Sequence, residues 1–313
     1  VLVDAHGHAQ PRLLLLALLL LLLLLLRRLS IRLRLGLLDD APEVVVALLE
    51  RQDPDAVMVV LPADHHIIKP EEFCKILKSA VNTAKKGDDL VTIGIQPHFA
   101  ETGFGYIEAD LMESTNTTDE RGFQVTAFKE KPDQKTADFF LKQGNYFWNS
   151  GMFVWKVSQI LQEIQEHLPA MYELLQRAKA EFGTKQEAAA INDFYMDCEP
   201  ISIDYGIMEK AASVKVIPGD FGWNDVGSWL AVYELFEKDK DSNTLEVLNY
   251  CLIDSHNNLI FSKSEKVIAL VGVKNIAVVE TEKALLVCDL QNAQRVKEVV
   301  EQLNASKELK SFT

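Results

Sequence analysis

The amino-acid sequence predicts an α/β domain followed by a small β-rich domain. In the first half of the chain, short apolar runs rich in β-branched residues alternate with stretches of helical periodicity, which is the pattern of strand–helix–strand units. Beyond about Lys238, short strands punctuated by Asn, Ser and Gly follow one another with hardly any helical period. We therefore expect an anomalous leucine-rich segment at 1–40, an α/β domain at 41–237 and a β-rich domain at 238–313.

The composition is that of an ordinary acidic globular protein. Of 313 residues, 48% are hydrophobic and 25% are charged, and the formal net charge is −14, so we expect no surface for nucleic acid. An acidic protein can still bind a nucleotide where a metal ion screens the phosphates. The four cysteines lie far apart in the sequence. This spacing argues against a zinc site or a disulfide framework, and favours reduced thiols in the cytoplasm.

The N-terminal segment is the anomaly. Residues 13–26 are leucine apart from Ala17, and two arginines follow. The run is shorter than the roughly 20 residues that a membrane-spanning helix needs, and near-homopolymeric leucine does not specify one packing arrangement. We rank an error in the sequence assignment first, a buried helix second and a membrane segment third, so no membrane partner is expected.

The next segment predicts the beginning of a parallel α/β unit. A helix is expected over 42–51, because its leading proline suits a first helical turn. The run Val57–Leu61 is expected to be a strand buried on both faces and ended by Pro62, which cannot donate to a sheet ladder. A helix over 69–87, with a glycine as its stop, and a strand over 90–97 complete the unit.

The middle of the chain predicts a change of pattern. It contains two strands that can form a hairpin, then a short helix and another strand, at 103–110, 122–132, 136–145 and 146–156. A long amphipathic helix begins at about Ser158, and Pro169 interrupts or kinks it.

The β-rich tail is expected to form a small β-solenoid or sandwich. The stretch "AQRVKEVVEQLNA" closes the chain as a helix, with Val296, Val299, Val300 and Leu303 facing inward. Exposed strand edges in this tail make self-association, such as a homodimer, an expectation.

Two aspartates are the first candidates for chemistry. Asp64 follows the carboxyl end of a predicted strand, where open α/β sheets bind ligands, although capping of the next helix or turn is an equally good interpretation. Asp225 lies between Gly222 and Gly227, which lets the backbone approach a ligand; alternatively, it caps the following helix beside a tryptophan corner of the core. If folding brings both carboxylates together, they can hold Mg²⁺, which keeps waters and takes phosphate oxygens.

Three further segments fit a pocket for a sugar phosphate. Gly105 belongs to a glycine pair in "TGFGYIE", where main-chain amides can reach a ligand. Glu130 and Lys131 are neighbours at the end of a predicted strand and would point to opposite faces. Asn149 offers an amide that suits sugar hydroxyls. Taken singly, each feature is more often structural than functional.

Six motifs in order are more specific: "VLPADH", "TGFGYIE", "FKEKP", "NSGMFVWK", "SIDYGIMEK" and "GWNDVGSW". Together they resemble the sugar-1-phosphate nucleotidylyltransferases, most of all the mannose-1-phosphate guanylyltransferases, or GDP-mannose pyrophosphorylases. The resemblance covers about residues 41 to 313. It implies a Rossmann-like nucleotidyltransferase domain with a mixed central sheet, and a tail similar to the family's left-handed β-helix.

The resemblance also implies a reaction and roles for residues. Mannose 1-phosphate would attack the α-phosphorus of GTP, releasing pyrophosphate and forming GDP-mannose, with Mg²⁺ clamping the phosphates. By match to the motifs, Asp64 and Asp225 would hold Mg²⁺, Lys131 would sit near the sugar's phosphate, and the sugar pocket would contain Gly105, Glu130, Asn149 and, as a weaker candidate, Asp204.

One departure from the family concerns the nucleotide's phosphates. The family's glycine-rich loop of the type GGxGTRxxP has no counterpart before Asp64, and this loop is what wraps the triphosphate. Three hypotheses follow: an active guanylyltransferase whose N-terminus is misrepresented, a non-catalytic relative that binds a nucleotide sugar and serves a regulatory role, or an enzyme for another hexose 1-phosphate. The first is favoured.

Overall fold

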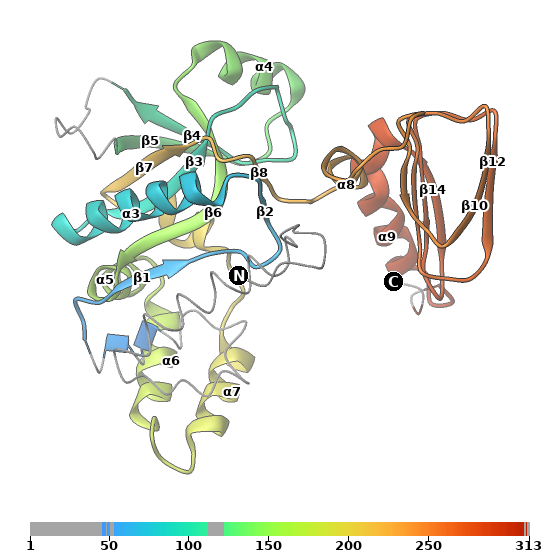
Figure 1. The fold of residues 1–313 in the computed structure, drawn as a ribbon. Coiled ribbons are helices and arrows are strands. Elements are labelled where there is room, and N and C mark those ends of the chain that lie inside the picture. Colours follow the sequence, from blue (N-terminus) through green and yellow to red (C-terminus); the bar gives the residue numbers. More distant parts are fainter. Residues whose placement is uncertain (1–45, 48, 51–52, 112–121, 310, 312–313) are drawn as a thin grey trace, which may run out of the picture.

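The structure is a computed structural model. It describes residues 46–47, 49–50, 53–111, 122–309 and 311. Figure 1 shows an α/β body, which carries the strands up to β8 (Trp223–Asn224), and a smaller β-rich body, which carries β9 (Thr244–Glu246) to β14 (Leu285–Asp289) and the last helix. The leucine run, with all three of its interpretations, lies outside the described residues. Of the helix expected over 42–51, the described positions are helical.

A six-stranded mixed sheet forms the centre of the α/β body, in the order β1-β6-β3-β7-β5-β4. The strands are β1 (Val57–Val60), β3 (Leu90–Ile95), β4 (Tyr106–Asp110), β5 (Phe123–Lys129), β6 (Tyr146–Lys156) and β7 (Val214–Gly219). Among these described strands, β3 and β7 pair in parallel and every other pairing is antiparallel. The mixed sheet implied by the family resemblance is therefore confirmed.

The first predicted strand differs from its expectation. β1 ends at Val60, and all of its residues are half-buried rather than buried on both faces. Its neighbour is not β3, because the long strand β6 lies between the two and is antiparallel to both. Among the described strands β1 is therefore at the edge of the sheet, which explains its exposure.

Helices cover both faces of the sheet and bury its centre. One apolar cluster joins β3 and β6 to α3 (Pro70–Lys86) and α4 (Gln134–Gln143). A second cluster joins the sheet to α5 (Val157–His167), α6 (Pro169–Ala180) and α7 (Glu187–Asp197). β3 is buried at all six positions. As predicted, Pro169 interrupts the long helix, because proline is tolerated in the first turn of α6 but not inside a helix.

The tail is a β-solenoid and not a sandwich, because its strands stack in parallel. β9 (Thr244–Glu246), β11 (Leu259–Ser262) and β13 (Ile276–Glu280) form one wall, closed by the antiparallel β14 (Leu285–Asp289). β10 (Asn249–Ile253) and β12 (Val267–Val271) form a second wall. Figure 1 shows these strands stacked side by side.

Asparagines stabilise the corners of this solenoid. Asn257 and Asn275 have positive φ angles of 57° and 59°, a conformation that asparagine tolerates better than most residues. The neighbouring Asn243 and Asn258 are fully buried. Asn258 donates from its backbone N and from Nδ2 to Asn243 Oδ1, at 3.0 Å each, and its own Oδ1 accepts from the Ile276 amide at 3.1 Å. This ladder satisfies buried polar groups from one turn to the next.

The last helix does not face inward as predicted. It divides into a 3₁₀ segment, η3 (Leu290–Arg295), and α9 (Val296–Ala305). Leu290 and Ala293 of η3 are buried, whereas Val299 and Val300 are 46% and 41% exposed. The change from three to 3.6 residues per turn shifts the phase of the apolar stripe, so η3 contacts the solenoid and α9 does not bury its valines. In the described part of the chain, no helix is long and apolar enough to cross a bilayer.

Candidate active site

The candidate residues gather where three strands end. β3 and β7 are parallel, with Ile95 opposite Gly219, and β1 runs in the same direction because both β1 and β3 are antiparallel to β6. The carboxyl ends of β1, β3 and β7 therefore lie along the same side of the sheet, where α/β proteins usually bind their ligands. The connections that leave this side carry Asp64, Gly105 and Asp225.

A small ribbon brings the two aspartates together. β2 (His66–Ile67) pairs antiparallel with β8 (Trp223–Asn224), and His66 lies opposite Asn224. Asp64 and Asp225 flank the same end of this ribbon, and the charges of both carboxylates influence the pKa of His65. Burial lowers the pKa of His65, while the charges of Asp64 and Asp225 oppose that shift. The His65 Nε2 atom lies 4.0 Å from Asp64 Oδ1.

The backbone around Asp225 is sharply turned. Asn224 Oδ1 accepts a hydrogen bond from the Val226 amide at 2.7 Å, and Asp225 Oδ1 accepts from the Gly227 amide at 2.9 Å. Val226 has a φ of 54°, which is strained for a β-branched residue and occurs mainly at functional sites. A Cβ on Gly227 would lie 2.7 Å from Asp225 Oδ2, so a larger residue there would displace the carboxylate from this position.

The donor set of this turn fits a hard divalent cation. Asp64 has an 86% exposed side chain, and Asp225 uses Oδ1 for an amide, which leaves its Oδ2 as a ligand. Two carboxylates suffice for Mg²⁺, which retains waters and binds phosphate oxygens. Across the described residues, no group of three or more His, Cys, Asp and Glu side chains forms a metal site. The ribbon offers a pair of carboxylates, Asp64 and Asp225, as candidate ligands.

Four of the predicted sugar-site residues form a second cluster. The Asn149 amide donates to the Gly105 carbonyl at 2.8 Å, and Asn149 Nδ2 donates to Asp204 Oδ1 at 2.8 Å. Asp204 begins η2 (Asp204–Met208), a short π-helix of the kind that is frequent at functional sites. A Cβ on Gly105 would lie 2.4 Å from Glu130 Oε1 and 3.4 Å from Asn149 Cβ. The structure therefore brings Gly105, Glu130, Asn149 and Asp204 together.

Burial and acidic neighbours disfavour the charged form of Glu130 in this cluster. Burial raises the pKa of Glu130, the charge of Asp204 raises it further, and Lys131 partly opposes the shift. Lys131 is exposed and follows the end of β5, with a φ of 42°. The expectation that Glu130 and Lys131 lie on a strand is therefore wrong, since the strand stops at Lys129 and the backbone turns there.

Aromatic rings connect the two clusters. Phe104, next to Gly105, contacts the Trp223 ring edge-on with centroids 5.2 Å apart, and it contacts Trp148 at the same distance. Trp223 belongs to the ribbon beside Asp225, and Trp148 precedes Asn149. The aspartate ribbon and the sugar cluster therefore share one apolar wall, which fixes their separation.

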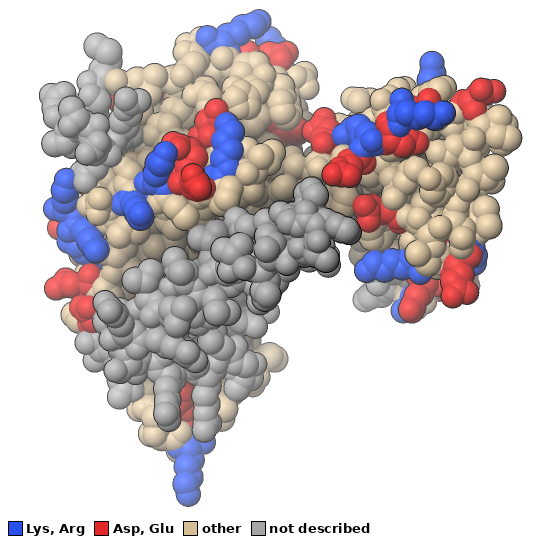
Figure 2. Space-filling model, viewed as in Figure 1, with Lys and Arg blue, Asp and Glu red and all other residues tan. Residues whose placement is uncertain are grey.

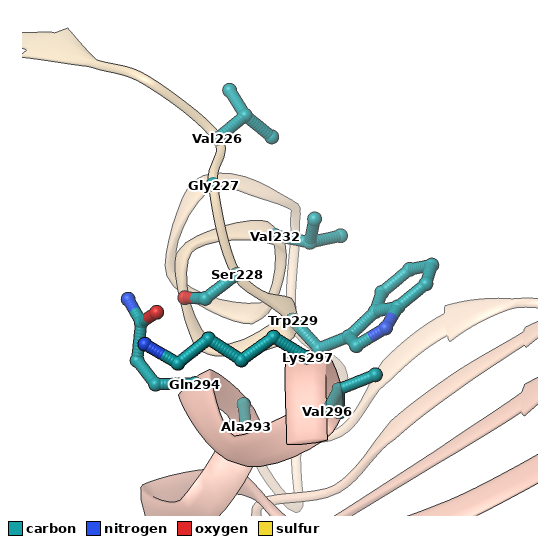
Figure 3. Close-up of a pocket in the computed structure, with 9 residues that line it drawn as sticks. All are labelled: Val226, Gly227, Ser228, Trp229, Val232, Ala293, Gln294, Val296 and Lys297. Carbon is teal, nitrogen blue, oxygen red and sulfur yellow. The ribbon is translucent and has the colours of Figure 1, made fainter. Parts of the chain in front are cut away.

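A cavity of about 350 Å³ lies beside the Asp225 turn. Figure 3 shows Val226, Gly227 and Ser228 following one another along the chain, with the Gln294 and Lys297 side chains lying below Ser228. A Cβ on Gly103 would lie 3.2 Å from Gln294 Nε2, so the glycine-pair loop also contacts the tail.

On the face shown in Figure 2, side chains of both charge signs are interspersed.

Neither aspartate caps the helix that follows it, so the alternative interpretation of each as a helix cap is wrong. Lys69 is the N-cap of α3, so Asp64 does not cap it. Ser228 caps α8 (Trp229–Leu235) by accepting from the Ala231 amide at 3.2 Å, so Asp225 does not. The tryptophan corner is also absent from the described structure, because Trp223 and Trp229 pack into different apolar clusters.

Sequence reasoning overlooked His65 and Gln294. His65 is one of two adjacent histidines in "ADHH", and nothing in that pattern selects it over His66. Gln294 lies in a helix that periodicity alone assigns to the tail. Only the three-dimensional arrangement places either residue at the site.

The fold is an α/β domain with a β-helix tail, and two family models match these two parts of the chain. Residues 35–242 match the nucleotidyl transferase family, and residues 249–303 match the mannose-phosphate isomerase/GMP-like β-helix domain. The first match covers more than half of the chain, so the chain belongs to the nucleotidyl transferase family.

The curated relatives include proteins named mannose-1-phosphate guanylyltransferase. The chain is 34% identical over 271 residues to a mannose-1-phosphate guanylyltransferase of Escherichia coli, covering 85% of this chain and 58% of that one. It is 39% identical over 271 residues to the xanthan biosynthesis protein XanB of Xanthomonas campestris pv. campestris, covering 85% and 55%. The chain thus spans little more than half the length of these relatives.

A solved structure agrees in fold. The crystal structure titled mannose-1-phosphate geranyltransferase, from Thermus thermophilus, superimposes with a TM-score of 0.70 at 31% identity, covering 84% of this chain and 73% of that one. The predicted fold class, an α/β nucleotidyltransferase domain with a β-helix tail, is confirmed.

Proposed function

We propose that this protein transfers a guanylyl group from GTP to mannose 1-phosphate, forming GDP-mannose and pyrophosphate in a Mg²⁺-dependent reaction. The observation that carries the proposal is the β2–β8 pairing, which sets Asp64 and Asp225 at one end of a ribbon. The sugar cluster lies at the same edge of the sheet. The names of the relatives support the choice of substrates.

The chemistry is an in-line displacement without a covalent enzyme intermediate. A phosphate oxygen of mannose 1-phosphate forms a bond to the α-phosphorus of GTP, and the bond from that phosphorus to the β-phosphate's bridging oxygen breaks. Pyrophosphate leaves with the electron pair. The protein therefore contributes positioning and the neutralisation of charge, which are the main sources of rate in such transfers.

Asp64 and Asp225 hold Mg²⁺ in this proposal. The ion, when bound, neutralises phosphate charge and orients the two reacting phosphates. The turn at Val226 and the Gly227 amide keep the Asp225 carboxylate in place before the ion arrives. Preorganisation of this kind reduces the cost of assembling the site.

The sugar cluster orients mannose 1-phosphate. Asp204 accepts from Asn149 Nδ2, and this bond holds the amide so that its orientation is defined before the sugar binds. Gly105 leaves room for the Glu130 carboxylate, which in this proposal accepts hydrogen bonds from sugar hydroxyls. In this proposal Lys131, at the turn after β5, neutralises charge on the phosphate of the sugar.

The proposal extends to the protein's surroundings. A cytoplasmic location is supported by the wide spacing of the four cysteines along the sequence, which argues against a disulfide framework. A homodimer through the solenoid is supported by the exposed apolar side chains of its second wall: Ile253, Val267 and Val271 are 52%, 66% and 67% exposed. No nucleic acid or membrane is included among the partners.

The test is a coupled assay of pyrophosphate release with GTP, mannose 1-phosphate and Mg²⁺. Turnover that requires all three components is the expected result, and a matched reaction with glucose 1-phosphate tests the choice of hexose. Tight binding of GDP-mannose without turnover would replace the proposal with a non-catalytic, sugar-nucleotide-binding function. The absence of both turnover and binding would reject the transferase and the binding protein alike.

A further inference from the structure

We propose that His65 is a positioning residue, which holds the two metal-binding carboxylates in register through its hydrogen bond to Trp223. The Trp223 indole N–H donates to His65 Nδ1 at 3.0 Å, and the two rings meet edge-on with centroids 5.3 Å apart. His65 directly follows Asp64, and Trp223 lies two residues before Asp225. This bond therefore connects the two aspartate-bearing segments of the chain.

Because both rings are largely buried, loss of the Trp223–His65 hydrogen bond would leave a polar group without a partner. The His65 side chain is 13% exposed, although that of its neighbour Asp64 is 86% exposed. Trp223 is 9% exposed. An indole N–H can only donate, so at a buried position it needs an acceptor. Removing that acceptor leaves an unsatisfied donor, which is costly enough to move the ring.

The geometry also fixes the imidazole. Because Nδ1 accepts from Trp223, the ring carries its proton on Nε2, and Nε2 is the atom that lies 4.0 Å from Asp64 Oδ1. At this distance Nε2 forms no direct hydrogen bond with Asp64, which leaves the carboxylate oxygens available for a cation. His65 resembles the outer partners that orient metal ligands in other proteins.

The β2–β8 ribbon is very short, so a side-chain hydrogen bond such as that between His65 and Trp223 contributes to its stability. β2 and β8 have two residues each and form a separate two-stranded sheet. An isolated ribbon of this kind is marginal in water, and two further backbone bonds, from the Ile68 and Lys69 amides to Gly222 and Phe221, continue it on one side only. On the side of the aspartates, the His65–Trp223 bond closes the ribbon.

The proposed role is positional, since the His65 imidazole acts on Trp223 and the chain beside Asp64 rather than as a ligand of the ion. This inference rests on the proposed function for its meaning, but its primary test, the binding of Mn²⁺ measured by electron paramagnetic resonance, requires no turnover. A failure of the proposed reaction would appear in the pyrophosphate assay of the wild type. A failure of this inference would appear in the metal affinities of the variants.

Three variants separate acceptor chemistry from packing. His65→Leu removes the acceptor and keeps an apolar side chain, whereas His65→Asn keeps an acceptor, because its Oδ1 can occupy the position of Nδ1. Trp223→Phe removes the donor and keeps a ring. His66→Leu, one residue along the same ribbon, is the matched control, because the Trp223 indole donates to His65 and not to His66.

We expect His65→Leu and Trp223→Phe each to weaken Mn²⁺ binding by about 10- to 100-fold, as loss of an outer partner does elsewhere. The double variant should be no weaker than either single variant, because both remove the same bond. His65→Asn should restore most of the affinity, and His66→Leu should leave it unchanged. Melting temperatures of all variants report whether the fold survives.

Several results would overturn the inference. Equal losses in His65→Leu and His65→Asn would show that the ring's packing matters and its acceptor does not. Additive losses in the double variant would show that the two side chains act separately. Wild-type affinity in His65→Leu, or a wild type that binds no Mn²⁺, would remove the positioning role altogether.

Discussion

Replacement of Gly105 by alanine tests the sugar cluster most sharply. A Cβ at this position would lie 2.4 Å from Glu130 Oε1, whereas ordinary contacts begin at 3.4 Å. The Glu130 carboxylate must therefore withdraw by about 1 Å, and a misplacement of that size can reduce catalysis about 100-fold. This factor corresponds to about 2.7 kcal/mol of transition-state stabilisation.

The loss should be specific to the sugar phosphate. Initial rates of pyrophosphate release at varied mannose 1-phosphate should show kcat/KM lowered about 100-fold, while KM for GTP stays near that of the wild type. The melting temperature should change little, because Gly105 does not have a left-handed backbone and the clash involves the end of a flexible side chain.

A matched control lies at the opposite edge of the sheet. A Cβ on Gly87 would lie 2.8 Å from Asp89 Oδ2, so Gly87→Ala also displaces a carboxylate, but one that precedes β3 rather than follows it. This variant should retain wild-type kinetics. Gly105→Ala with an unchanged kcat/KM for mannose 1-phosphate, or with equal losses for both substrates, would refute the reasoning.

Three other predictions concern charge and the solenoid. Because the pKa of Glu130 is raised by burial and by Asp204 above its ordinary value of 4.5, its contribution to stability is fully present below pH 4.5 and is lost as pH rises through the higher folded value. Glu130→Gln should therefore raise the melting temperature at pH 7 while raising KM for mannose 1-phosphate; a lower melting temperature would contradict this. Asn258→Ala removes the buried ladder's central rung and should cost about 3 kcal/mol in chemical denaturation, whereas Asn249→Ala, at an exposed position, should stay within about 0.5 kcal/mol. Hydrogen bonds from Lys266 and two serines lower the pKa of Glu280 to about 2, so its stabilisation is present above pH 4.5 and is lost toward pH 2; acid melts of Glu280→Gln should lack this step.

Periodicity predicted the elements but not their neighbours. The strand expected at 146–156 is β6 as observed, and the helix expected over 69–87 is α3, because alternation and helical spacing are properties of a segment alone. Which strands pair is decided by the whole sheet. The insertion of β6 between β1 and β3 therefore could not be predicted from the apolar run at Val57–Leu61.

For the site too, local features could be predicted from the sequence, whereas the contacts between distant segments could not. The place of Asp64 after a strand follows from the sequence, as does the glycine-flanked turn of Asp225. Their juxtaposition depends on β2 and β8, two-residue strands that are too short to produce a periodic signal. The selection of His65 over His66 depends on the approach of Trp223, which comes from a distant part of the chain.

The strained and irregular positions were also beyond the sequence. Lys131 and Val226 have positive φ angles, although neither residue type favours that conformation. Local rules fail most often where function imposes a geometry on the chain, and both residues lie beside the proposed substrates. The misoriented valines of α9 have a different origin, the phase shift at η3.

The dissociation constant of Mn²⁺ in the presence of GDP-mannose tests the central claim most directly, when it is compared among the wild type, Asp64→Asn, Asp225→Asn and the double variant. If both carboxylates hold one ion, each single change should abolish most of the affinity, and the double change should add little. Wild-type affinity in either single variant, or two independent losses that add, would show that the aspartates do not share a metal ion.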